Sequence, residues 1–296
     1  MANFVPQCYP CALRRALCTA ERVSDDEWLQ QKVVDESMLI LRDSESGQTP
    51  AEKVGGLLKR VHSVLGSSDP WREIRERWFG EMQEASSGMR SLVEQDPDPL
   101  GRALLLSARC NVFANEILQS KAIREDLRRL GIRAGDPVDA EFVHDERALL
   151  DSALSTASQI LFLHDTAPEL PADLILMEQI HLQNPDSDIT SIVCEEPMLL
   201  KACLEDADRA GIVGERGAGQ VIAWRSEGLG LVLDEGSETL RRVVEEADLI
   251  VAKGSAHHQT LSGRRLPVFS LVRAKCPVTA AAQSCRIGEL LLIRAD

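Results

Sequence analysis

Three acidic residues recur at intervals of four near the middle of the chain: Asp165, Glu169 and Asp173. In a helix this spacing places them on one face, where an acidic patch suits a divalent cation or a cationic ligand. The alternative is that Asp165 caps the helix, Glu169 pairs with a surface lysine and Asp173 is solvated. The spacing is compatible with a cation site and with the alternative, and it does not decide between them.

A lysine and a glycine, Lys253 and Gly254, directly follow an apolar run. A lysine at the end of a buried strand suits an ammonium group aimed at an anion, and glycine lets the backbone approach closely. Three histidines have side chains that can act as a base or as metal ligands: His164, and the two neighbours His257 and His258. Neighbouring histidines in a loop are, however, more often simply hydrogen-bonded.

Other motifs leave their chemistry open. Cys8 and Cys11 have the spacing of half a zinc site, but no second such pair follows. Packing, redox sensitivity and a structural metal all remain possible for them. Asn111 interrupts the apolar side of an expected helix, where it either faces a cleft or bonds a neighbouring carbonyl. The glycine-rich stretch 214–219 precedes a strand, whereas a dinucleotide fingerprint follows one, so we expect a loop.

The second half of the chain supplies the elements that must position these residues. Short apolar runs alternate with helical stretches at 172–182, 199–210 and 237–247, which predicts a mostly parallel sheet with helices on both faces. In such sheets ligands bind beyond the carboxyl ends of the strands. The predicted strands cover 160–163, 189–194, 221–224, 249–252 and 268–272.

The first half is predicted to be helical, because apolar residues recur at steps of three and four. The expected helices cover 25–41, 50–65, 71–82 and 100–120. We therefore expect an α/β protein in which a helical N-terminal domain, residues 1–152, packs on an α/β domain, residues 153–296, that carries the cleft.

Composition narrows the function. The chain has 296 residues and a formal net charge of −14. An acidic surface repels phosphate backbones and anionic lipid, so nucleic-acid and membrane partners are not expected. The N-terminus has no secretory signal, and no apolar run approaches the ~18 residues of a membrane span. We expect a cytoplasmic protein with a small-molecule substrate, of open oligomeric state.

Seven motifs in order resemble those of the damage-control phosphatase family, also called acidic-residue-methyltransferase-like and once known as domain of unknown function 89. The similarity runs nearly end to end. It rests on the segments 8–17, 69–71, 108–111, 164–173, 197–207, 252–257 and 273–276. The resemblance implies a helical region over an α/β sheet and a Mg²⁺- or Mn²⁺-dependent phosphatase of damaged or surplus phosphometabolites.

The departures from the family pattern concern its metal site. The resemblance implies that the ion is held by an Asp and an Asn of the motif at 164–173 and by an Asp of the motif at 197–207. It also implies that the lysine of the motif at 252–257 contacts phosphate. Asp165 and Lys253 match, but the Asn falls on Thr166 and the second Asp falls on Lys201. A further family Asn falls on His257.

An ammonium group at a metal position reverses the local charge. Two unit charges ~4 Å apart interact by about 4 kcal/mol at an effective dielectric of 20, and a dication roughly doubles that repulsion. We therefore expect that the metal is lost and that Lys201 pairs with Asp165. If an ion is retained, Asp165 is its ligand.

The main hypothesis is a metal-independent enzyme that uses S-adenosylmethionine, by methyl transfer or by elimination or cyclisation of the sulfonium. Asp165, Lys201 and Lys253 are the predicted catalytic residues, with Lys201 as a possible base. The predicted ligand-binding residues are Asn111, Thr166, Glu169, Asp173, Gly254, His257 and Lys275. No cofactor is firmly predicted. One alternative is a Mg²⁺- or Mn²⁺-dependent phosphatase, and another is a catalytically inactive binding protein.

Overall fold

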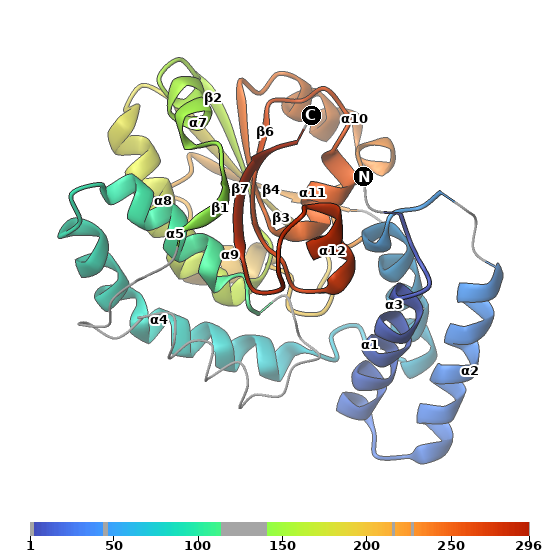
Figure 1. Cartoon of the computed structure of the whole chain (residues 1–296). Coiled ribbons are helices and arrows are strands. Elements are labelled where there is room, and N and C mark those ends of the chain that lie inside the picture. The colour runs from blue at the N-terminus through green and yellow to red at the C-terminus, as the bar shows by residue number, and fades with distance from the viewer. Residues whose placement is uncertain (1–2, 44–46, 114–140, 215–216, 226–227, 296) are drawn as a thin grey trace.

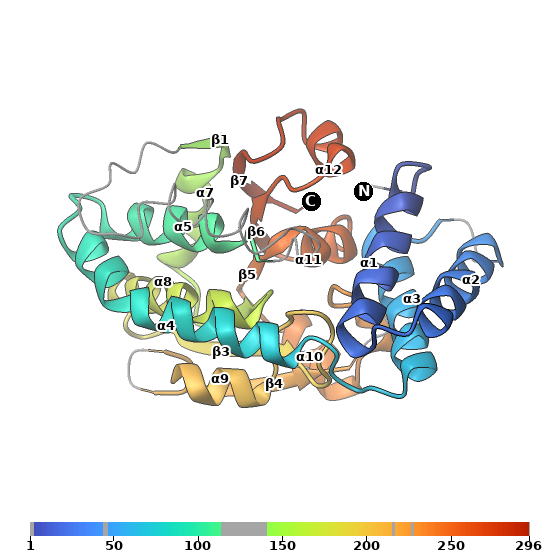
Figure 2. The same cartoon turned by 90° about the horizontal axis from the view of Figure 1, so that it is seen from below.

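The computed structural model describes residues 3–43, 47–113, 141–214, 217–225 and 228–295 (Figure 1). Its first three helices are α1 (Cys8–Val23), α2 (Glu27–Asp43) and α3 (Pro50–Leu65), which pack against one another. A capping box between Thr49 and Glu52 begins α3, and Gly66, at φ +62°, ends it. These helices lie to one side of the sheet, as Figures 1 and 2 show.

The next two helices join this bundle to the rest of the molecule. They are α4 (Arg72–Glu94) and α5 (Pro99–Cys110), and both pack against α8 (Leu170–Gln183). Helix α8 is buried on nearly all sides. In Figure 2, α4 runs along the sheet region toward the N-terminal helices.

The strands among the described residues form one seven-stranded sheet in the order β1-β7-β6-β5-β2-β3-β4. Neighbouring strands are parallel except β6 and β7. The strands are β1 (Phe142–Asp145), β2 (Gln159–Leu163), β3 (Asp188–Cys194), β4 (Gln220–Trp224), β5 (Leu249–Lys253), β6 (Val268–Arg273) and β7 (Leu290–Arg294).

Helices cover both faces of the sheet. Ile160 and Phe162 of β2 lie in one apolar core with side chains of α5 and α8, while Leu161 and Leu163 lie in a second core with side chains of α10 (Glu238–Glu245) and α11 (Gly254–Leu261). Strand residues alternate between faces, so a strand buried on both sides is a continuous apolar run. The remaining helical elements are α7 (Arg147–Leu154), α9 (Leu204–Ala210), α12 (Pro277–Ala282) and two short 3₁₀ turns, Ala167–Glu169 and Leu233–Glu235.

The order of the strands places a switch point beside β2. The chain passes from β2 through β3 to β4 on one side, then crosses back so that β5 pairs with β2 on the other side. The connections leaving β2 and β5 therefore diverge at their carboxyl ends. Ligands of open α/β sheets bind at such points.

The predicted α/β class is confirmed, and each predicted strand is present. The helix expected at 199–210 begins only at Leu204, because Leu199 has a left-handed backbone with φ +56°. His257 and His258 lie on α11, so the prediction that they occupy a loop was wrong. The helix expected at 100–120 ends at Cys110, and its part beyond residue 113 lies outside the described residues.

The boundary at residues 152 and 153 stays a prediction. Strand β1, which precedes that boundary, pairs with β7, and a single apolar core contains side chains from both halves of the chain. None of the helices in the described part of the chain combines the length and the apolarity needed to cross a bilayer.

Candidate functional site

The polar residues identified in the sequence meet at the switch point. Asp165 follows β2, Lys253 ends β5 and Lys275 follows β6. Lys201 reaches the same place from a turn after β3, because its backbone forms an antiparallel bridge with Thr166. This turn is further fixed by Ala167 N–H, which donates to Leu200 O at 2.8 Å, and by Ala202 N–H, which donates to Asp165 O at 3.2 Å.

Asp165 is the centre of an outer cluster of charges. Its Oδ1 accepts a hydrogen bond from Lys201 Nζ, so the predicted ion pair is present. Its Oδ2 accepts from Asn111 Nδ2 at 2.7 Å and lies 3.8 Å from Lys275 Nζ. Lys275 in turn donates to Asn111 Oδ1 at 2.6 Å. One carboxylate therefore holds two lysines, the second partly through Asn111.

Lys253 is the centre of an inner cluster. Its Nζ donates to Glu169 Oε2 at 2.9 Å and to Asp173 Oδ1 at 2.6 Å, and all three side chains are 0% exposed. Asp173 also bonds His164 Nδ1 at 2.9 Å and Ser107 Oγ at 2.8 Å. The predicted acidic patch is thus a buried ion-pair network, because a lysine 80 residues along the chain lies between two of its carboxylates.

Hydrogen bonds join the two clusters. Asn111 Nδ2, which donates to Asp165, also donates to Glu169 Oε1 at 2.9 Å, and Thr166 Oγ1 donates to the same oxygen at 2.7 Å. Asn111 therefore bonds two carboxylates and one lysine, rather than the neighbouring carbonyl that was one of the two expectations.

Gly254 and His257 support the clusters from α11. Gly254 has φ +82°, and a Cβ there would lie 2.0 Å from Asp165 Oδ2, so only glycine leaves room for this carboxylate. His257 Nδ1 accepts from Leu231 N–H at 3.1 Å, which leaves the proton on Nε2 to be donated to His164 O at 3.1 Å. Both residues position other groups in the site.

Charges and burial shift the ionisation of the clusters. Burial raises the pKa of the Asp165 carboxyl, but Lys201 and Lys275 outweigh burial and hold this pKa below its usual range. For Asp173, burial is likewise outweighed by Lys253 and His164. Burial lowers the pKa of Lys253, but its two carboxylates raise it above the ordinary value. Burial raises the pKa of Glu169 more than Lys253 lowers it. Lys253, Asp165 and Asp173 are therefore charged at neutral pH.

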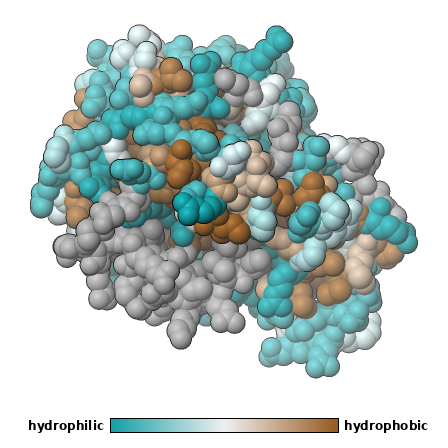
Figure 3. All heavy atoms as spheres, in the orientation of Figure 1, coloured by the Kyte–Doolittle hydropathy of each residue, from teal (hydrophilic) through white to brown (hydrophobic). Residues whose placement is uncertain are grey.

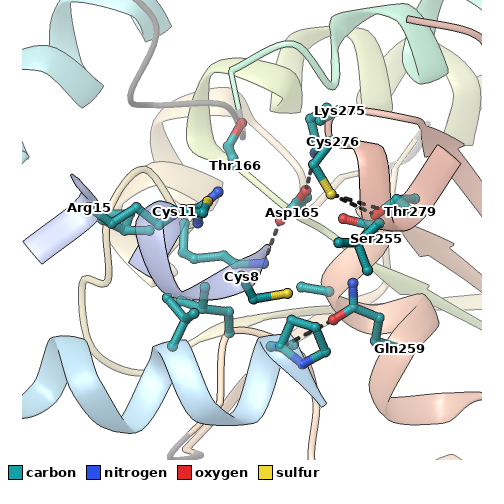
Figure 4. A pocket seen from close by; sticks show the side chains of 18 of the residues that line it. Cys8, Cys11, Arg15, Asp165, Thr166, Ser255, Gln259, Lys275, Cys276 and Thr279 are labelled. Atoms are coloured by element: carbon teal, nitrogen blue, oxygen red, sulfur yellow. Dashed lines mark hydrogen bonds and ion pairs between the residues drawn. The ribbon is translucent and has the colours of Figure 1, made fainter. Parts of the chain in front are cut away.

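A cavity of about 380 Å³ opens beside the outer cluster (Figure 4). It lies between α1 and α3 of the N-terminal bundle and the carboxyl edge of the sheet. On the face shown in Figure 3, apolar side chains gather between the sheet region and this bundle. The residues that carry polar or thiol groups into the cavity are Gln7, Cys8, Cys11, Arg15, Asp165, Thr166, Lys201, Ser255, Gln259, Lys275, Cys276 and Thr279.

The cavity separates the predicted site residues into two groups. Asp165, Thr166, Lys201 and Lys275 line it. The others lie behind this layer and are not among the lining residues: Asn111, Glu169, Asp173, Lys253, Gly254 and His257. Lys253 was predicted to be catalytic and the other five to bind a ligand, and these roles stay predictions. In the structure the polar side-chain atoms of these residues bond other protein groups.

Sequence reasoning gave no role to several lining residues. Arg15 lies inside the N-terminal motif, and Ser255 and Cys276 directly follow the strand ends that were identified as ligand positions. Their neighbourhood was therefore visible in the sequence. The resemblance places Gln259 where the family often carries a Glu, but its contact with the cavity depends on the packing of α11 against α3.

The residues present do not fit a divalent cation at Asp165. Such an ion needs several oxygen ligands, but both Asp165 oxygens accept bonds from Lys201 or Asn111, and the Asn111 amide oxygen accepts from Lys275. Within the described ranges, no group of three or more His, Cys, Asp or Glu side chains is arranged to hold a metal.

The fold and the cavity define a small-molecule site at the switch point of a doubly covered α/β sheet. The family model described as the damage-control phosphatase ARMT1-like domain matches residues 4–291. The chain therefore belongs to this family, and the resemblance predicted from its motifs is confirmed.

Similar proteins extend over the whole chain. A protein of Archaeoglobus fulgidus named damage-control phosphatase is 28% identical over 288 residues, covering 97% of each chain. A damage-control phosphatase of Pyrococcus horikoshii is 22% identical, covering 97% of this chain and 96% of its own. The crystal structure of a DUF89 family protein from Pyrococcus horikoshii has a TM-score of 0.82 at 20% identity, covering 100% of both chains. This last likeness shows the fold.

Proposed function

We propose that this protein is a phosphatase that hydrolyses the phosphate monoester of a small metabolite in the cavity beside Asp165. The observation that carries the proposal is that Arg15, Lys201 and Lys275 line this cavity with a single carboxylate, Asp165, among the described lining residues. A phosphate monoester carries close to two negative charges at neutral pH, so this excess of cations favours it. Family membership and the names of the relatives support the class of reaction.

The second part of the proposal is that lysines, and no divalent cation, supply the positive charge at Asp165. In the reaction, water oxygen bonds to phosphorus, the ester P–O bond breaks and the leaving oxygen takes a proton, which yields an alcohol and inorganic phosphate. Catalysis of such a transfer is mainly positioning and stabilisation of charge on the phosphoryl oxygens. Lys201 and Lys275 are suited to this task, and Asp165 is suited to hold them in position.

The test is release of inorganic phosphate from a panel of phosphate monoesters, with EDTA and with added Mn²⁺. We expect release that resists EDTA and falls about a hundredfold in Lys201→Met, the typical cost of losing one stabilising group. The control is Lys32→Met, which removes an exposed lysine of α2. Release that requires Mn²⁺ and survives Lys201→Met would overturn the metal-independent part. Phosphate binding without any release would favour a catalytically inactive binding protein.

The S-adenosylmethionine hypothesis receives no support from the relatives, whose names indicate phosphatases. The geometry gives a physical reason to set it aside. Glu169 and Asp173, the carboxylates expected to attract the sulfonium, are 0% exposed and bound to Lys253. The remaining carboxylate, Asp165, already pairs with Lys201. The cytoplasmic location and the exclusion of nucleic-acid and membrane partners stay predictions.

A further inference from the structure

The cavity has an apolar wall in addition to its charged lining residues. Helix α3 contributes Ala51 and Val54 to this wall, the turn after β3 contributes Leu199 and Leu200, and Leu229 completes it. In Figure 4, α3 runs below the cavity, and Asp165 and Lys275 lie above it. The cavity is therefore amphipathic, because its lining combines Lys201 and Lys275 with these aliphatic side chains.

Several backbone polar groups of this wall are already hydrogen-bonded to other protein groups. Ala51 N–H donates to Gln259 Oε1 at 3.0 Å, and Ala51 O accepts from Leu229 N–H at 2.9 Å. Leu200 O accepts from Ala167 N–H at 2.8 Å. A hydroxyl group packed on these aliphatic side chains would lose hydrogen bonds to water and gain none from the side chains themselves, which is unfavourable.

The backbone of Leu199 independently indicates that the aliphatic surface contacts a ligand. Its φ of +56° is a left-handed conformation that glycine adopts freely and that a side chain makes costly. The chain nevertheless has a leucine there, and this leucine lines the cavity while being 4% exposed. Strained residues of this kind cluster at ligand sites.

We infer that the substrate is a phosphate monoester whose organic part is apolar, an alkyl or aryl group rather than a polyhydroxylated sugar. This inference rests on the proposed function for the reaction and adds the substrate class. The phosphate lies at the end with Lys201 and Lys275, and the organic part packs on the wall formed by α3, Leu199, Leu200 and Leu229. The volume of about 380 Å³ lies within the range of small-molecule pockets.

Two measurements on the full chain test the inference. The first compares kcat/KM for cyclohexylmethyl phosphate with that for glucose 6-phosphate, two esters of a primary alcohol that each carry one phosphate and a six-membered ring. We expect a ratio of at least about tenfold in favour of cyclohexylmethyl phosphate, the lower end of what apolar contacts give. The second measures, by calorimetry, the affinities of methyl-, butyl- and phenylphosphonate, which are not hydrolysed. We expect affinity to rise along that series.

A matched pair of variants on α3 locates the effect. Val54→Thr places a hydroxyl on the wall at almost constant volume, and the ratio of cyclohexylmethyl phosphate to glucose 6-phosphate hydrolysis should fall several-fold. Val64→Thr makes the same change on the same helix but outside the cavity lining, and this ratio of kcat/KM values should stay unchanged.

The outcomes separate this inference from the proposed function. Equal or better use of glucose 6-phosphate, or affinity that does not rise from methyl- to phenylphosphonate, overturns the inference while leaving hydrolysis intact. Rising phosphonate affinity with no phosphate release from any ester supports the apolar subsite and overturns the phosphatase proposal. Absence of binding by every phosphonate overturns the inference.

Discussion

Lys253 is the side chain on which the inner cluster depends, since it lies between Glu169 and Asp173 with no exposed surface. Lys253→Met would leave two buried carboxylates facing each other. Removing one partner of a buried ion pair typically costs about 3–5 kcal/mol, so we expect a loss of this size in the free energy of unfolding, measured with urea at pH 7. The exposed control Lys32→Met should change it by less than about 0.5 kcal/mol. An unchanged urea midpoint for Lys253→Met would show that the cluster adds no stability.

His257 makes stability depend on pH. Burial lowers the pKa of its imidazole to about 3, from an ordinary value near 6.5, so the unfolded chain binds the proton more readily. Its contribution to stability is therefore complete above pH ~6.5 and is lost as the pH falls toward 3. At pH 5 the loss is about 2 kcal/mol. Urea unfolding at pH 7.5 and pH 5 should show it, and His257→Gln should reduce the difference. A pH dependence that is the same in His257→Gln would contradict this origin.

The residues of the site were easier to predict than their roles. Asp165, Thr166, Lys201 and Lys275 line the cavity, and the Lys201–Asp165 pair followed from the resemblance, which placed Lys201 at a metal position, together with its charge. Glu169 was assigned to a ligand because a spacing of four gives a helix face but not the partner opposite it. That partner, Lys253, comes from another strand, and only the pairing of β2 with β5 brings the two together.

At the scale of elements, the turn from β5 into α11 sets how closely two segments approach. Gly254→Ala would place a Cβ 2.0 Å from Asp165 Oδ2 and would require a left-handed alanine. We expect the carboxylate to shift, phosphate release to fall at least about tenfold, and stability to drop by about 1–3 kcal/mol. The control is Gly80→Ala within α4, where a Cβ meets nothing within 4 Å and stability should rise by about 0.5–1 kcal/mol. Full activity in Gly254→Ala would show that Asp165 is not held as described.

Most strands predicted from the sequence are buried along nearly their whole length, but the partly buried β4 was also predicted and the buried β7 was missed. β5 is a continuous apolar run and was found, whereas β1 has alternating partly buried and exposed residues over only four positions. Its pairing with β7 is a tertiary property, since the end of β1 at Asp145 and the start of β7 at Leu290 are 145 positions apart in the chain. Helix α11 was missed because its eight residues include two histidines and a glycine, which give little helical periodicity.

At the scale of the whole molecule, the shared apolar core predicts that both halves unfold together. Trp71 and Trp78 lie in the core that joins the halves, and Trp224 lies in the second core. The fluorescence of Trp224→Phe, which reports the first half, should therefore change at the same urea concentration as the far-ultraviolet circular dichroism. Two separate transitions would instead support independent domains at 1–152 and 153–296.

The insertion of β2 between β3 and β5 also governs the route by which the chain folds. Strands β2 and β3 can pair early, but the lysine at the end of β5 reaches Glu169 only after a segment of 80 or more residues has closed into a loop. Contacts between residues so far apart form slowly. Until then Glu169 and Asp173 lack the ammonium group of Lys253, and burying them without it is unfavourable. We therefore expect the cavity edge and the buried ion-pair network to be completed in the same late step.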